Sequence, residues 1–308
     1  MDKALIFGIG GFVGPYLARE LQAHGYRVYG TDSKDVGSKA FFDGFYKSDI
    51  LDKDSLRKVI DIVHPSHIIN LAAVSSVGLS WKIPDITMQV NVNGTLNIFN
   101  SCLESNIKPK ILLIGSSEEY VSCNHPMDEN IPLNSNNPYG ISKIAQEQFA
   151  KIYREKFTWD IFSVRAFNHI GPGQRTSFVI PSWCKQVADI EKGLQEPIIK
   201  VGNLDVSRDF TDIRDVVRAY RLVLESKDSS QVYNIGSGNS VSLREILSMI
   251  CSLSTKKIII ETDQALLRPN DTPYICCDSG KIQKRLGWKP VYSLKKDSLK
   301  GIYLSFLK

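Results

Sequence analysis

Long apolar runs are missing from this sequence of 308 residues. Its strongly apolar stretches, such as Ile111-Leu112-Leu113-Ile114, fall far short of the roughly 20 residues that a membrane-spanning helix needs. The chain also starts without the basic residues, apolar stretch and cleavage site of a signal peptide, because Met1-Asp2-Lys3 leads directly into a strand-like segment. We therefore expect a cytoplasmic protein with no membrane partner.

An excess of one charge and a metal-binding pattern of cysteines are missing as well. The formal net charge is +5 and the basic residues are scattered, so no nucleic-acid partner is predicted. The six cysteines have no metal-ligand spacing, which predicts neither a metal site nor a disulfide framework. With 43% hydrophobic and 23% charged residues, and no repeat or long linker, the chain is expected to be globular.

Short apolar runs alternate with amphipathic segments through the first half of the chain, which indicates βαβ units and a parallel sheet. Strands are expected at residues 4–7, 27–29, 67–72, 111–114 and 161–164. We predict an α/β fold, a Rossmann-type doubly wound parallel sheet with a smaller mixed α/β C-terminal substrate domain. The predicted domains are residues 1–167 for dinucleotide binding and mainly 168–308 for substrate, with about 209–235 returning to the first domain.

A glycine-rich turn follows the first expected strand and precedes an amphipathic segment. Gly8, Gly11 and Gly14 let a backbone approach a pyrophosphate that rests on a helix N-terminus, and Gly10 adds another position without a side chain. The alternative is that these glycines only permit a tight strand-to-helix turn. In its sequence context, the turn predicts a dinucleotide site.

Two acidic residues follow the next segments of the same half. Asp32 comes after the second strand, where a carboxylate accepts hydrogen bonds from ribose hydroxyls and repels a 2′-phosphate, so NADH is preferred over NADPH. Lys34 nearby softens that preference. Asp49 is predicted either to contact the adenine or to cap the helix that follows it.

Tyr139 and Lys143 lie one turn apart on an expected helix that opens with Asn137 as N-cap and Pro138 in the first turn. A lysine ammonium beside a phenol favours the phenolate, so we expect a depressed Tyr139 pKa. Such a tyrosine transfers a proton while a nicotinamide transfers a hydride. The pair alone is a common pattern, but joined to the glycine turn it predicts an enzyme.

Polar side chains follow the strand at residues 111–114, at the sheet edge where ligands bind in open α/β folds. The Ser116 hydroxyl is expected to bind a substrate oxygen beside Tyr139, and Glu118 to act as a second acid or base. The alternatives are turn chemistry for Ser116 and Ser117 and a solvated loop for Glu118 and Glu119.

Together these motifs resemble the extended short-chain dehydrogenase/reductase superfamily. Within it, three further stretches resemble the branch of GDP-mannose 4,6-dehydratase, and more closely its sister group, the GDP-6-deoxy-4-keto-D-mannose reductases. The stretches are Phe167-Asn168-His169-Ile170-Gly171-Pro172-Gly173-Gln174, residues 201–212 and Arg268-Pro269-Asn270-Asp271. The resemblance implies an NAD(P)H-dependent 4-ketoreductase that converts GDP-4-keto-6-deoxy-D-mannose to GDP-D-rhamnose.

The resemblance also implies roles for single residues. Tyr139 is the proton donor, Lys143 binds the nicotinamide ribose, and Ser116 orients the keto oxygen. Arg208 and Arg268 clamp the diphosphate, although structural ion pairing is the alternative for both. Further cofactor contacts are expected at Phe12, Val13, Ile50, Leu71, Ala72 and Ala73, and further substrate contacts at Ser117, Glu118, Asn168, Val179, Lys185, Val201 and Asp271.

Three alternatives remain open from the sequence. Glu118 matches the position of the dehydratase base, whereas Phe12-Val13 and Ile170-Gly171 depart from the dehydratase pattern. An NDP-sugar 4-epimerase is a further possibility, and a non-catalytic dinucleotide-binding regulator is the alternative from another class. By analogy with relatives, we expect a homodimer through a four-helix interface built from residues 95–104 and 138–157.

Overall fold

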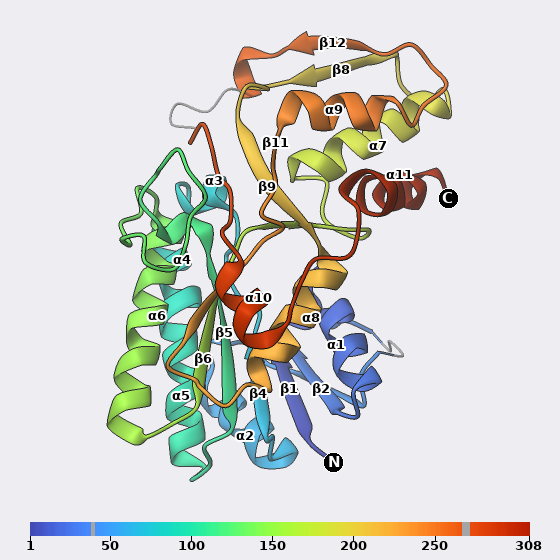
Figure 1. The fold of residues 1–308 in the computed structure, drawn as a ribbon. Coiled ribbons are helices and arrows are strands. Elements are labelled where there is room, and N and C mark those ends of the chain that lie inside the picture. The colour runs from blue at the N-terminus through green and yellow to red at the C-terminus, as the bar shows by residue number, and fades with distance from the viewer. Residues whose placement is uncertain (38–40, 267–271) are drawn as a thin grey trace.

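A seven-stranded parallel sheet forms the centre of the protein, seen in a computed structural model that describes residues 1–37, 41–266 and 272–308 (Figure 1). The strand order is β10-β6-β5-β4-β1-β2-β3, and the order reverses between β1 and its neighbours β2 and β4. In doubly wound sheets this reversal opens a ligand crevice at the carboxyl ends of the strands. The strands are β1 (Lys3–Phe7), β2 (Arg27–Asp32), β3 (Gly44–Lys47), β4 (His67–Asn70), β5 (Lys110–Ser116), β6 (Ile161–Ala166) and β10 (Val232–Ile235).

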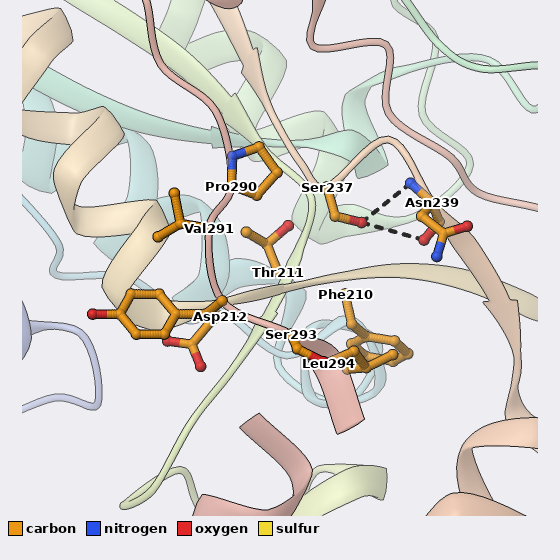
Figure 2. Close-up of a pocket in the computed structure, with 10 residues that line it drawn as sticks. Phe210, Thr211, Asp212, Ser237, Asn239, Pro290, Val291, Ser293 and Leu294 are labelled. Atoms are coloured by element: carbon orange, nitrogen blue, oxygen red, sulfur yellow. Dashed lines mark hydrogen bonds between the residues drawn. The ribbon is translucent and has the colours of Figure 1, made fainter. Parts of the chain in front are cut away.

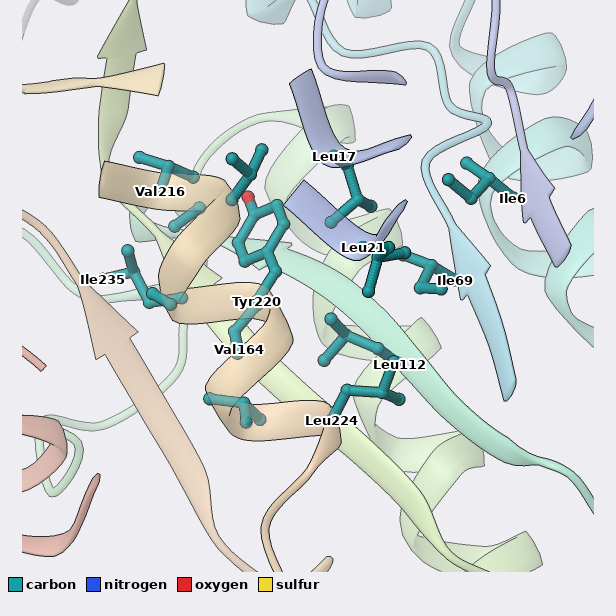
Figure 3. Packing of buried hydrophobic residues seen from close by; sticks show 14 of the residues in the cluster. Ile6, Leu17, Leu21, Ile69, Leu112, Val164, Val216, Tyr220, Leu224 and Ile235 are labelled. Atoms are coloured by element: carbon teal, nitrogen blue, oxygen red, sulfur yellow. The ribbon is translucent and has the colours of Figure 1, made fainter. Parts of the chain in front are cut away.

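Helices cover both faces of this sheet. On one face, Leu17 and Leu21 pack with Val216 and Tyr220 against the strands (Figure 3). On the other face, helical side chains that include Leu56 form a second buried cluster. The helices of the first face are α1 (Gly14–Ala23) and α8 (Ile213–Leu224), with α10 (Gly280–Leu286) beside β10, and those of the second are α2 (Lys53–Val63), α5 (Gly94–Glu104) and α6 (Pro138–Phe157).

Local sequence explains where the α6 helix begins and where the α2 helix ends. Asn137 caps α6 by accepting a hydrogen bond from Gly140 N at 2.9 Å, and Pro138 takes the first position, as the sequence predicts. The α2 helix ends at Val63, before Pro65. The chain then makes short helical turns before α5, namely α3 (Val77–Ser80), α4 (Pro84–Met88) and the π-helix η1 (Gln89–Asn93), with the 3₁₀ turn η2 (Ser117–Glu119) after β5.

A smaller layer is built from the second half of the chain, above the large sheet in Figure 1. It contains two small sheets, β11-β9-β7 and β12-β8, which pack with three helices around a third apolar cluster. Its elements are β7 (Asn168–Ile170), α7 (Val179–Glu191), β8 (Ile198–Val201), β9 (Ser207–Asp212), β11 (Ser240–Ser242), α9 (Leu243–Cys251), β12 (Ile259–Thr262), η3 (Gln264–Leu266), η4 (Leu294–Leu299) and α11 (Lys300–Leu307).

The fold class predicted from the sequence is confirmed, while the strands of the smaller layer were not predicted. Each of these strands has three to six residues, too few for an alternating pattern to stand out. The α8 helix and β10 lie with the large sheet, and the domain division stays a prediction. Among the described residues, none of the helices has both the length and the apolarity to cross a bilayer.

Candidate active site

Tyr139, Lys143 and Ser116 come together at the carboxyl edge of the large sheet. Ser116 ends β5, and α6 places the other two residues one turn apart over that end. The Tyr139 phenol and the Ser116 side chain share a hydrogen bond. The Lys143 Nζ lies 5.8 Å from the Tyr139 ring centroid and donates to Ile114 O at 2.8 Å and to Gln146 Oε1 at 3.0 Å. The expected trio is therefore assembled around one phenol.

The charge state of this trio differs from the sequence-based expectation. Burial raises the pKa of Tyr139 above its ordinary value, although the Ser116 hydrogen bond opposes that shift. Burial also lowers the pKa of Lys143 to about 8, while Glu119 works in the opposite direction. The predicted depression of the Tyr139 pKa is thus wrong for this structure, because burial and the charges of Glu119 and Glu118 outweigh the opposing Ser116 hydrogen bond.

Glu118 lies beside the trio and faces a hollow. Its Oε2 accepts a hydrogen bond from Asn137 Nδ2 at 2.9 Å, so one residue both caps α6 and holds this carboxylate. The side chain is half-buried, which fits a group that meets a ligand. The hollow is lined by Ser117, Glu118, Tyr120, Val121, Ser122, Met127, Asn134, Asn136, Thr272 and Ile275.

Glu119 is fully buried, so the alternative in which it lies in a solvated loop is wrong. Its Oε1 accepts a hydrogen bond from Ser116 N at 2.6 Å, which closes a capping box around η2. Its Oε2 has no hydrogen-bond partner among the described residues, although Arg165 Nε lies 3.8 Å away. Burial, followed by the charge of Glu147, raises the pKa of Glu119 to about 8.

The glycine turn fits a closely approaching dinucleotide. Gly8 has a φ of +77°, and a Cβ there would come within 2.7 Å of Ala72 N in the chain that follows β4. At Gly14 a Cβ would come within 2.0 Å of Ile9 O, so only glycine allows α1 to start this close to β1. The turn thus lies beside Leu71 and Ala72, at the start of α1, where a helix N-terminus is of the kind that binds anions.

The acidic residues of this half have separate partners. Asp32 ends β2 and accepts hydrogen bonds from Gly10 N and Lys34 N, both at 3.1 Å, so it lies beside the glycine turn. Asp49 is exposed and accepts from Leu51 N at 2.9 Å. The α2 helix is capped by Asp52, so the alternative role of Asp49 as its cap is wrong.

Other predicted cofactor positions surround the turn. Val13 and Phe12 are half-buried at the start of α1, and the Phe12 ring stacks on His169 with centroids 6.1 Å apart. Ile50 is 7% exposed and packs in the second cluster against α5, so its side chain contributes to the core. Phe12 and Val13 follow β1, Ile50 follows β3, and His169 lies in β7, so these residues gather at the carboxyl edge of the sheet.

The predicted substrate positions are more widely spread. Asn168 starts β7, beside Phe210 of β9, and Arg208 Nη1 donates to Ser207 O at 2.9 Å. Val201 is 1% exposed inside the third cluster, and its carbonyl accepts a hydrogen bond from Asp263 N at 2.8 Å, so it contributes to the core. Val179 begins α7 with 37% exposure, and the exposed Lys185 pairs with Asp189. Arg268 and Asp271 lie outside the described residues.

A buried polar layer beneath the trio was not predicted. Gln146 binds Lys143 Nζ and donates to Thr95 Oγ1 at 2.9 Å. Asn91, within the π-helix η1, donates to Ser142 Oγ at 2.8 Å, and Ser142 Oγ donates to Tyr139 O at 2.6 Å. Single polar residues among apolar neighbours give no periodic signal, so the sequence alone does not reveal this layer.

A second pocket lies at the end of β9, away from this trio (Figure 2). Among the described residues that line it, Asp212 has the sole carboxylate, which Arg214 and Ser298 already bind. None of the predicted catalytic side chains lines this pocket. Its lining residues are Phe210, Thr211, Asp212, Ser237, Asn239, Pro290, Val291, Tyr292, Ser293 and Leu294.

The sequence matches known proteins over nearly its whole length. The family model described as GDP-mannose 4,6 dehydratase matches residues 5–297. GDP-6-deoxy-D-mannose reductase of Pseudomonas aeruginosa is 31% identical over 98% of this chain and 96% of its own. GDP-mannose 4,6 dehydratase 2 of Arabidopsis thaliana is also 31% identical, over 95% of this chain and 84% of its own.

A solved structure of a similar protein has the same fold. The RMD protein of Pseudomonas aeruginosa, complexed with NADPH, superposes with a TM-score of 0.88 at 29% identity, over 100% of this chain and 99% of that one. The fold and site define an extended short-chain dehydrogenase/reductase. The chain belongs to the GDP-mannose 4,6-dehydratase family. The predictions of an enzyme and of NAD(P) as its cofactor are therefore confirmed; a preference for NADH is not.

Proposed function

We propose that the protein reduces the C4 ketone of GDP-4-keto-6-deoxy-D-mannose with NAD(P)H and gives GDP-D-rhamnose. The observation that carries the proposal is the Tyr139 phenol, which is hydrogen-bonded to Ser116 and lies over the buried Lys143 at the carboxyl edge of the sheet. The phenol is protonated at neutral pH, as a proton donor must be, and the nearby Lys143 ammonium stabilises the phenolate that forms.

The chain's own residues divide the work in this proposal. Bound NAD(P)H supplies the hydride that is added to C4. Ser116 orients the keto oxygen, and Tyr139 gives its proton to that oxygen as the C4–H bond forms. The Lys143 ammonium lies beneath the phenolate that is left and stabilises its charge. Gly8 and Gly14 leave room for the pyrophosphate, and Asp32 accepts hydrogen bonds from the adenosine ribose.

The main alternative is GDP-mannose 4,6-dehydration. That reaction needs a carboxylate to remove a C5 proton, and Glu118 is available at the hollow beside Tyr139. Two departures from the dehydratase pattern favour reduction: Phe12-Val13 in the glycine turn and Ile170-Gly171 after β7. The Pseudomonas reductase matches more of the chain than the plant dehydratase does.

A coupled assay tests the proposal. The purified protein is mixed with GDP-4-keto-6-deoxy-D-mannose and either NADH or NADPH, and both the loss of reduced-nicotinamide absorbance and the sugar product are followed. We expect oxidation of the cofactor with GDP-rhamnose formed, and faster oxidation of NADH because Asp32 repels a 2′-phosphate. Conversion of GDP-mannose to the 4-keto sugar without net cofactor consumption identifies a dehydratase instead.

A Glu118→Gln variant separates the two reactions further. Glutamine keeps an oxygen that can accept the Asn137 hydrogen bond but cannot remove a proton. We expect most ketone reduction to remain in this variant, within about threefold, because a general base normally contributes a factor of about 10² or more. Loss of reduction equal to that of a Tyr139→Phe variant contradicts the assigned roles.

A further inference from the structure

We propose that Glu119 is a positioning residue of the active site, which holds Ser116 through its backbone N–H and lies between that residue and the Arg165 guanidinium. The inference rests on the proposed reduction for its kinetic consequences, but its cofactor-binding consequence is independent of the sugar. Neither the sequence patterns nor the roles assigned above give Glu119 any function.

The first step is geometric. Ser116 stands at the point where β5 turns into η2, and its hydroxyl accepts a hydrogen bond from Glu118 N at 3.2 Å. The Glu119 carboxylate holds the other side of the same residue, through Ser116 N at 2.6 Å. A Cβ at Gly115 would come within 2.4 Å of Glu119 Oε1, so the carboxylate lies directly against the β5 backbone. Glu119 thereby holds the Ser116 backbone in place where β5 turns into η2.

The second step concerns charge. The Arg165 guanidinium is already committed, because its Nε and Nη2 bind Glu147 at 3.0 and 2.6 Å and its Nη1 binds Tyr120 OH at 2.9 Å. Glu119 therefore shares the Arg165 guanidinium with Glu147, at the longer distance of 3.8 Å, and its second oxygen has no hydrogen-bond partner among the described residues. The charges that act on it are Glu147 and Arg165 nearby and the Lys143 ammonium.

The groups around Glu119 come from several elements. The hollow side contributes Glu118, α6 contributes Tyr139, Lys143 and Glu147, and β6 contributes Arg165. Two carboxylates, Glu119 and Glu147, thus share one guanidinium, and Lys143 is the remaining cation. Ionised Glu119 favours the charged Lys143, and charged Lys143 favours ionised Glu119.

The third step is the effect on chemistry. When Tyr139 gives up its proton, a phenolate forms close to Lys143, and the transfer is stabilised only while the lysine is charged. Burial lowers the pKa of Lys143 to about 8, and the Glu119 charge keeps it from falling further. Without that charge, Lys143 loses its proton at a lower pH.

Two variants separate position from charge. Glu119→Gln keeps an oxygen for Ser116 N but removes the charge, whereas Glu119→Leu removes both. For each we would measure kcat and KM against pH, and the NADPH dissociation constant against pH by nicotinamide fluorescence. Glu104→Gln is the matched control, because Glu104 is exposed and pairs only with Lys53 and Arg57 among the described residues.

For Glu119→Gln we expect the alkaline limb of kcat/KM, and that of NADPH binding, to move about one pH unit lower, the size of a typical environmental shift. Near pH 6.5 this variant should retain most of its kcat. Glu119→Leu should also lose about 100-fold in kcat at every pH, as expected when a catalytic hydroxyl is misplaced by about 1 Å. Glu104→Gln should change neither limb.

If the pH dependence of kcat/KM and of NADPH binding is unchanged in Glu119→Gln, Glu119 does not influence the charge of Lys143. A wild-type kcat in a folded Glu119→Leu protein overturns the positioning role. Should Glu119→Leu fail to fold, Glu119→Gln still decides the charge role and Glu119→Asp decides the positioning role. The aspartate keeps the charge but is too short to reach Ser116 N unchanged, so a wild-type kcat in that variant contradicts positioning. If wild-type protein binds NADPH but does not reduce the 4-keto sugar, the proposed function fails, and the limb of NADPH binding still tests Glu119.

Discussion

At the residue scale, the chemistry depends on a few side chains whose charge is set by burial. Tyr139 is 9% exposed and Lys143 4% exposed, and desolvation moves each pKa in the direction that favours the neutral form. The sequence predicted which residues meet, but it could not predict their burial. The pKa of Tyr139 was therefore expected to fall, whereas it rises.

The pH dependence of reduction follows from these two groups. Tyr139 must be protonated to donate, and Lys143 must be charged to stabilise the phenolate that remains. The lower of the two limits is the Lys143 pKa, which burial brings to about 8. We therefore expect kcat/KM for ketone reduction to be constant below this pH and to fall tenfold per unit as the pH rises through it. If kcat/KM of a Lys143→Met variant falls at the same alkaline pH as in the wild type, another group controls this pH dependence.

Removal of the phenol is the direct test of the same residues. In Tyr139→Phe we expect kcat to fall by about 10²- to 10⁴-fold, the usual contribution of a general acid, while KM for the sugar changes little. Tyr26→Phe is a suitable control, because the Tyr26 hydroxyl binds Glu225 at 3.3 Å, distant from the trio. Full activity without the Tyr139 hydroxyl would favour a dinucleotide-binding regulator over an enzyme of the proposed kind.

At the element scale, the β1–α1 turn carries the cofactor site, and its glycines are not equivalent. In Gly14→Ala the new Cβ would come within 2.0 Å of Ile9 O, so the start of α1 must move away from β1. In Gly25→Ala, at the other end of α1, φ is +86° and no atom lies within 4 Å. Both variants cost stability, the second by about 1–2 kcal/mol from its left-handed backbone.

Cofactor affinity distinguishes the two glycines. We expect Gly14→Ala to weaken NAD(P)H binding by at least about tenfold, or about 1.4 kcal/mol, because the helix N–H groups leave their position. Gly25→Ala should bind the cofactor as the wild type does, despite a lower melting temperature. The measurements are nicotinamide fluorescence titration and thermal unfolding. Equal affinities in both variants would contradict the pyrophosphate role of the turn and favour a purely structural one.

Sequence patterns predicted the elements that have strong periodicity or clear caps. The α6 helix with Asn137 and Pro138, and the α2 helix that stops before Pro65, needed no tertiary information. The short strands of the second half were missed because pairing across the chain, as between Asn168 and Phe210, creates them. The alternative of a solvated loop for Glu119 stayed open because its surroundings include Arg165 and Glu147, which lie far along the sequence.

At the scale of the whole molecule, α5 and α6 lie side by side on one flank of the large sheet (Figure 1). The Tyr153 hydroxyl donates to Asn100 Oδ1 at 2.8 Å, and its ring packs on Phe99 with centroids 4.8 Å apart. The outer side of α6 leaves Ile141 48% and Ile152 53% exposed, three helical turns apart on one face. A homodimer through α5 and α6 is still a prediction, and this apolar stripe supports it.

Oligomeric state therefore gives the last test. If two copies bury the stripe, light scattering coupled to gel filtration should give about twice the chain mass of 34.5 kDa. Ile152→Glu would put a charge into that contact without touching the buried side of α6, and we expect the mass to fall to that of one chain. The exposed Ile62 of α2, 62% accessible, provides a control in Ile62→Glu, which should stay dimeric. Because Tyr139 and Lys143 lie on the same helix, the monomeric variant should also show whether α6 needs its partner to hold them: an unchanged kcat would mean that the sheet alone positions the pair.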